Sequence, residues 1–202
     1  MRALVAAALL AAGAAQAQTP LLDAIAEGKE PVAAVLVLGG KVELEARNDK
    51  RETPLHLAAE KGMRALTRLL LDAGARVRAR TATGETALHH AALNEDPAVA
   101  RLLLDAKADA RALNDHGESA LHWAAYGGND QVVALLLERG ADADACNLDG
   151  NLPLHGAAAG GHASTVRLLL ARTRHPGLKN LKGQTPRDLA LERGHDEVAR
   201  LF

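Results

Sequence analysis

The sequence predicts a solenoid, a fold in which short similar units stack along one axis, because two patterns recur with the same period. A six-residue phrase begins at positions 53, 86, 119, 152 and 185, so that consecutive copies start 33 residues apart. A Leu-Leu-Leu triplet recurs in the same register at 69–71, 102–104, 135–137 and 168–170. A period this regular indicates one supersecondary unit stacked on itself, and it argues against a domain with a single closed core.

The wording of the phrase adds a family resemblance. Its five copies read TPLHLA, TALHHA, SALHWA, LPLHGA and TPRDLA. They resemble the T-P-L-H-x-A motif of the ankyrin repeat, a 33-residue unit with a turn and two helices. The resemblance covers about residues 19–202. It implies an all-α ankyrin-repeat solenoid of stacked helix–turn–helix units with projecting hairpin turns.

The first 17 residues have the pattern of a signal peptide. Arg2 supplies a positive charge, an apolar run covers 3–12, and Ala15, Gln16 and Ala17 match an A-x-A cleavage site. The run is shorter than the roughly 20 residues that a membrane-spanning helix needs. We expect an exported, periplasmic bacterial protein whose mature chain, residues 18–202, forms the ankyrin-repeat domain. The alternative is an N-terminal helix packed on the first repeat.

The repeat register divides the rest of the chain into six units. An N-terminal cap is expected over 19–52, four full repeats over 53–85, 86–118, 119–151 and 152–184, and a C-terminal cap over 185–202. Atypical terminal units are the expected caps of a solenoid, because their outer faces meet water.

Within each repeat, the phrase is expected to start the first helix. Thr53, Thr86, Ser119 and Thr185 stand where an N-cap hydroxyl accepts a free backbone N–H, whereas Leu152 cannot do so. The second helix carries the leucine triplet. A projecting hairpin turn follows, with a glycine at 84, 117, 150 and 183 where the backbone has to turn sharply.

Composition and charge argue against a nucleic-acid partner and against self-association. The net charge is −1. Residues 85–150 hold twelve acidic and four basic side chains, between two flanks in which basic side chains prevail. A nucleic-acid groove requires one continuous positive track. The sparse apolar surface favours a monomer. We also expect no insertion into a membrane.

Neither a metal site nor a catalytic site is predicted. The phrase histidines at 56, 89, 122 and 155 recur at stacked positions that are about 8–10 Å apart, too far for two of them to share one zinc ion. The resemblance implies a structural role for them, in hydrogen bonds to the neighbouring turns. The chain has two serines, no G-x-S-x-G elbow and no phosphate-binding glycine loop. We therefore expect no enzyme activity and no cofactor.

The resemblance implies that a partner protein binds the concave face, formed by the turn tips and the exposed side of the first helices. Trp123 and Tyr126, the only Trp and the only Tyr, lie three residues apart on one first helix, and both residue types are enriched at binding hot spots. The candidate partner-binding residues are Asp49, Lys50, Glu52, Glu60, Lys61, Thr83, Glu85, Asn94, Asp115, His116, Glu118, Trp123, Tyr126, Asp149, Asn151, Lys182, Gln184 and Arg193.

The sequence thus predicts a protein-binding module and leaves two roles open. One is an immunity-like inhibitor that neutralises a toxic enzyme. The other is an accessory factor that supports a partner enzyme, for example an oxidative-stress enzyme. The single cysteine, Cys146, is expected in a turn region, either as an inert thiol or as a redox-sensitive one.

Overall fold

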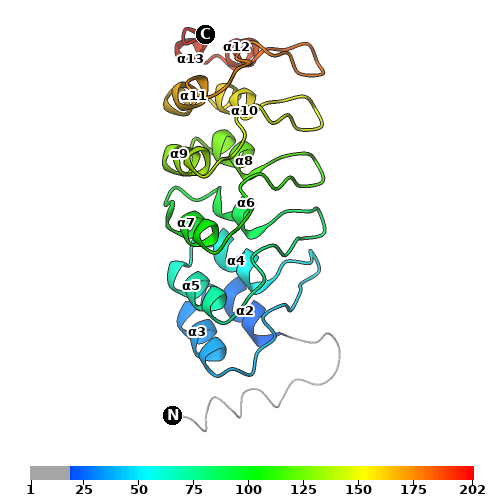
Figure 1. Ribbon diagram of the computed structural model, residues 1–202, viewed down its shortest axis with the longest axis vertical. Coiled ribbons are helices and arrows are strands. Elements are labelled where there is room, and N and C mark those ends of the chain that lie inside the picture. The colour runs from blue at the N-terminus through cyan, green and yellow to red at the C-terminus, as the bar shows by residue number, and fades with distance from the viewer. Residues whose placement is uncertain (1–18) are drawn as a thin grey trace.

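A computed structural model describes residues 19–202 of the chain, and the expected signal peptide lies outside these residues. The described part contains twelve α-helices and no β-strand, which confirms the all-α solenoid. The helices follow one another in pairs along the axis of the stack (Figure 1). Their bounds are α2 (Pro20–Ala26) and α3 (Glu30–Leu38), α4 (Pro54–Glu60) and α5 (Arg64–Asp72), α6 (Ala87–Ala91) and α7 (Ala98–Asp105), α8 (Ala120–Gly127) and α9 (Asp130–Glu138), α10 (Pro153–Ala159) and α11 (Ala163–Leu170), α12 (Pro186–Glu192) and α13 (Asp196–Ala199).

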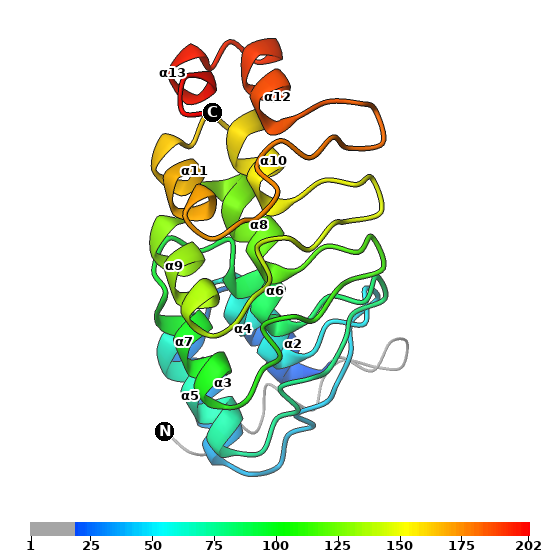
Figure 2. The ribbon, with the colours of Figure 1, turned by 45° about the horizontal axis from the view of Figure 1, so that its top comes forward.

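The helix pairs form two layers with a row of turns on one side. The first helices α2, α4, α6, α8, α10 and α12 pack in this order and form one layer, and the second helices form the other. The turns between pairs project on the side of the first helices (Figure 2). In the described part of the chain, no helix is long and apolar enough to cross a bilayer.

Leucine and alanine at repeating positions form the core. The phrase leucines at 55, 88, 121 and 154 and the middle leucines of the triplets at 70, 103, 136 and 169 are at most 1% exposed. Burying one such side chain contributes roughly 1.5–3 kcal/mol. The phrase alanines at 58, 91, 124 and 157 are fully buried, and their small side chains let neighbouring first helices approach closely.

The phrase histidine joins each full repeat to the next. Its Nε2–H donates to a backbone carbonyl 29 residues further on, at 3.2 Å from His56 to Glu85, 3.0 Å from His89 to Glu118, 3.1 Å from His122 to Asn151 and 3.3 Å from His155 to Gln184. The carbonyl can only accept, so Nδ1 carries no proton in the neutral ring and accepts in turn. It accepts the backbone N–H of the residue that precedes the helix, at 3.0–3.2 Å. This confirms the structural role that the resemblance implies.

The sequence predicts that the N-cap hydroxyl accepts a backbone N–H of its helix. This is wrong for three of the four units that have such a hydroxyl. The hydroxyls of Thr53, Thr86 and Ser119 donate to the histidine Nδ1 at 2.8–2.9 Å, because the neutral ring offers an acceptor there. Only Thr185 accepts a helix N–H, from Asp188, whose carboxylate replaces the imidazole. Leu152 has no hydroxyl, but its backbone N–H still reaches His155 Nδ1 at 3.0 Å. The imidazole, rather than the hydroxyl, therefore closes the start of these helices.

A second recurring set of hydrogen bonds holds the turns. The side-chain oxygen of Asn48, Thr81, Asn114, Asn147 or Asn180 accepts the backbone N–H groups of the residues two and four positions later. Consecutive turn tips are also bonded to each other, N–H to carbonyl, at 2.9–3.0 Å: Ala82 to Lys50, Asp115 to Thr83, Leu148 to His116 and Leu181 to Asp149. We call this row of bonds the tip ladder. It fixes the spacing of the projecting turns.

The second full repeat departs from the others in its first helix. α6 has five residues, whereas the first helices of the other units have seven or eight. The following segment contains Pro97, which disfavours a helical conformation of the residue before it. Asn94 in this segment donates from its side-chain amide to the Ala59 carbonyl at 2.7 Å, so that the irregular segment stays attached to the preceding repeat.

The array should lose stability as the pH falls below the pKa of an ordinary histidine. Burial lowers the pKa of His56 and of His89 to about 4, and burial also lowers the pKa values of His122 and His155. Below about pH 6.5 the unfolded chain therefore binds protons that the folded chain does not, and protonation favours unfolding. For His56 and for His89 we expect the free energy of unfolding in urea to fall by on the order of 1 kcal/mol per pH unit between about pH 6.5 and 4, and His122 and His155 should act in the same direction. A free energy that stays constant over this range would contradict the prediction.

Lys107 should be a site of backbone strain. It follows α7 with a φ of 68°, where the corresponding position after α5 and α9 is occupied by Gly74 and Gly140. A left-handed conformation costs a residue with a Cβ roughly 1–2 kcal/mol, and the exposed Lys107 side chain can be removed without opening the core. We expect Lys107→Gly to raise the urea midpoint of unfolding. Lys107→Ala is the control, since it removes the side chain and retains the Cβ, and an equal gain in both variants would exclude strain as the cause.

Candidate interaction surface

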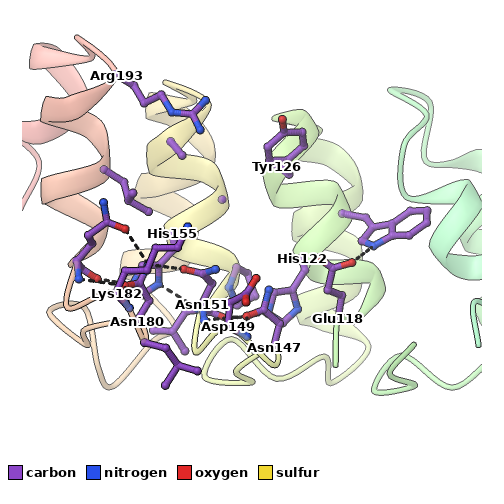
Figure 3. A pocket seen from close by; sticks show the side chains of 18 of the residues that line it. Glu118, His122, Tyr126, Asn147, Asp149, Asn151, His155, Asn180, Lys182 and Arg193 are labelled. Carbon is purple, nitrogen blue, oxygen red and sulfur yellow. Dashed lines mark hydrogen bonds between the residues drawn. The ribbon is translucent and has the colours of Figure 1, made fainter. Parts of the chain in front are cut away.

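A groove lies between the first helices α8, α10 and α12 and the turns beside them (Figure 3). Its cavity volume is about 670 Å³, which is in the range of sites that enclose a ligand or several side chains of a partner. Eight of the eighteen candidate residues line it: Glu118, Trp123, Tyr126, Asp149, Asn151, Lys182, Gln184 and Arg193.

A missing side chain accounts for the groove. Gly156 lies on α10 at the repeat position that Leu57, His90, Trp123 and Leu189 occupy in the other units. The three atoms nearest to a Cβ added at Gly156 would be the Tyr126 Cα, Cβ and backbone nitrogen, at 3.6 Å, which is an ordinary contact. Gly156 thus lines the groove without a side chain of its own, beside Tyr126.

The aromatic pair on α8 occupies two different environments. Trp123 is half-buried, and its Nε1–H donates to Glu118 Oε2 at 2.9 Å. Its ring also lies edge-on to His89, with ring centroids 5.6 Å apart. Tyr126 is 64% exposed and lies across the groove from Arg193 (Figure 3). Trp123 is thus part of the groove wall, whereas Tyr126 offers most of its ring to solvent.

Charges of both signs surround the groove. Glu118 and Asp149 are acidic, and Lys182 and Arg193 are basic. Exposed apolar area accompanies them, because Leu181 at the next turn tip is 79% exposed and Leu93 is half-exposed. An apolar surface with a charged rim is typical of protein-binding sites.

The other ten candidate residues lie elsewhere on the array. Asp49, Lys50, Glu52, Glu60 and Lys61 border a separate depression beside α2 and α4. Asn94 is bonded to the preceding repeat, as described above. Thr83, Asp115 and His116 belong to the tip ladder through their backbones. Glu85 accepts a hydrogen bond from the Thr81 hydroxyl at 2.9 Å. The structure therefore brings the candidates together in two clusters, not in one continuous surface.

Comparison with known families identifies the architecture. Models of ankyrin repeats match residues 36–91, 77–147 and 121–202. The chain belongs to the ankyrin-repeat family. Ankyrin repeats generally mediate protein–protein interaction and are typically non-enzymatic, so this array is a protein-binding module. No curated protein matches the chain.

Sequence reasoning missed several groove residues of this ankyrin array. Asn147 and Asn180 line the groove and also hold the turns. The period itself could have revealed them, because Asn48, Asn114, Asn147 and Asn180 share one repeat position, at which only Thr81 differs. Gly156 was a visible departure from the larger residues at its position. The opening it leaves depends on packing, which one sequence does not specify.

Cys146 is exposed in the turn region. Partial burial, together with the nearby carboxylates of Asp144 and Asp142, raises the pKa of its thiol. Because the thiolate is the reactive form, this environment favours the inert thiol over the redox-sensitive one.

Gly156→Ala should stabilise the ankyrin array, because glycine costs about 1 kcal/mol relative to alanine inside a helix and the added Cβ meets no clash. We expect the free energy of unfolding in urea to rise by about this amount. Gly117→Ala is the opposite case, since Gly117 has a φ of 73° and an added Cβ would lie 3.1 Å from the Leu148 backbone nitrogen. Gly117→Ala should therefore destabilise the protein. A Gly156→Ala variant that is less stable than the wild type would contradict the prediction that a Cβ fits at Gly156 without a clash.

Proposed function

We propose that this chain is an exported bacterial protein, located in the periplasm, that binds a partner protein in the groove between α8, α10 and α12. The observation that carries the proposal is the groove that Gly156 lines beside the exposed Tyr126 ring. Tyrosine offers a large contact area at a small cost in conformational entropy, and an adjoining pocket lets a partner side chain pack against it.

The rigid backbone around the groove supports the same proposal. The tip ladder and the histidine bridges hold the turns and helices in place before any partner arrives. Little ordering is then required on binding, so more of the contact energy appears as affinity. We expect the partner to insert an apolar side chain between Tyr126 and Leu181, with charged residues of both signs around it.

The test is retention of a partner from an extract of the native cell envelope on the immobilised full chain. Gly156→Leu fills the groove with a residue that the family phrase accepts at two other units, Leu57 and Leu189. Tyr126→Ala removes the exposed ring. We expect one protein to be retained by the wild type and lost with both variants, while both variants keep their helical circular dichroism.

Val35→Ala is the matched control, because Val35 is 65% exposed on α3, outside the groove. Equal retention by the wild type and the Gly156→Leu and Tyr126→Ala variants would place the interface elsewhere on the array. The identity of the retained protein separates the two roles: a toxic enzyme whose activity falls on binding indicates an inhibitor, and an enzyme whose activity rises indicates an accessory factor.

A further inference from the structure

One histidine of this array has no partner although it is buried. His90 lies on α6, is 7% exposed, and its Nε2 is enclosed without a hydrogen bond. The nearest charged group is Glu85, whose Oε2 lies 3.7 Å from Nε2, beyond hydrogen-bond distance. In the following repeat the equivalent residue Trp123 donates to the equivalent carboxylate of Glu118 at 2.9 Å. The His90 ring therefore lacks the bond that Trp123 makes at the equivalent position.

Two further carboxylates from the two preceding units meet this ring. Glu52 is the last residue of the N-terminal cap, two positions before α4, and Glu60 is the last residue of α4. One oxygen of each and one ring nitrogen of His90 all lie within 4.8 Å of one another. Glu52 is only 6% exposed, so that its charge is largely removed from water. Two carboxylates and an imidazole from three consecutive units thus meet.

In the last unit, the positions equivalent to Glu52 and Glu60 are joined by hydrogen bonds. Gln184 and Glu192 occupy there the repeat positions of Glu52 and Glu60. The Gln184 amide donates to both carboxylate oxygens of Glu192, at 2.9 and 2.7 Å. With Glu52 in place of the amide, the donor is lost and a second negative charge is added. In residues 19–202, neither Glu52 nor Glu60 is paired with a lysine or arginine, so the protein supplies no fixed counterion.

We propose that Glu52, Glu60 and His90 form a binding site for a divalent transition-metal ion of the zinc class. An imidazole nitrogen with two carboxylate oxygens is a ligand set that zinc accepts, whereas magnesium and calcium prefer oxygen alone. Zinc lies about 2.0–2.2 Å from such ligands, so the three atoms must move somewhat closer together. Glu60 is exposed and can move, while Asn48 Nδ2 donates to Glu52 Oε2 at 2.6 Å and orients that carboxylate.

An ion can reach this site from solvent, because Glu52 and Glu60 border the depression beside α2 and α4. The site differs from the one excluded on the sequence, because it uses a single histidine that is not one of the four at 56, 89, 122 and 155. It joins three consecutive units, so the bound ion should stabilise the folded array by mass action.

The test is calorimetric titration of Zn²⁺ into the full chain after treatment with a chelator, at neutral pH. Three variants accompany the wild type. Glu60→Gln changes an exposed side chain, and His90→Leu introduces the leucine that stands at the equivalent positions 57 and 189. Glu192→Gln is the matched control, because Glu192 is the equivalent of Glu60 in the last unit. We expect one ion per chain in the wild type and in Glu192→Gln. Affinity should fall at least about tenfold in Glu60→Gln and in His90→Leu.

Two results would overturn the proposal. One is the absence of saturable Zn²⁺ binding by the wild type. The other is equal binding by all four proteins, which would place the ion at another surface group. Thermal unfolding supplies a second readout: Zn²⁺ should raise the midpoint of the wild type and leave that of Glu60→Gln nearly unchanged. An unchanged wild-type midpoint would contradict the proposal as well.

Discussion

The hydrogen bond from each phrase histidine to the next repeat is the interaction on which the array depends. One imidazole accepts the backbone N–H at the start of its own helix and donates to a carbonyl 29 residues later, so that it links helix, turn and neighbouring repeat. Both bonds require a neutral ring of one tautomer. Burial enforces this state by lowering the pKa. The last unit has Asp188 at this position, which caps its own helix.

Departures from the repeat create the features that distinguish this protein from a regular array. One position of the phrase shows this clearly: Leu57 is buried, His90 is buried without a hydrogen bond, Trp123 is bonded to Glu118, and Gly156 leaves a groove. The scaffold tolerates all of these because the histidine bridges and the core leucines lie at other positions. Specific chemistry can therefore change from repeat to repeat without disturbing the stack.

The period and the phrase were sufficient to predict the architecture, because both follow from residues that every repeat needs. The direction of the N-cap hydrogen bond could not be predicted in this way, since it depends on the protonation state of a histidine whose burial only the fold determines. The short helix α6 could not be predicted from the phrase, because its copy TALHHA matches the family motif as closely as the copies that begin longer helices. The meeting of Glu52, Glu60 and His90 joins three different repeat positions from three consecutive units, and comparing equivalent positions along the sequence does not reveal such a cluster.

The tip ladder has a consequence for how such a surface can evolve. Its bonds join backbone groups only, and its four steps pair Lys50 with Ala82, Thr83 with Asp115, His116 with Leu148 and Asp149 with Leu181. These residues share neither charge, size nor polarity, yet the same bond forms at every step. Selection can therefore exchange side chains at the tips with little penalty in folding. The row of turns is a surface on which new recognition can arise by single substitutions.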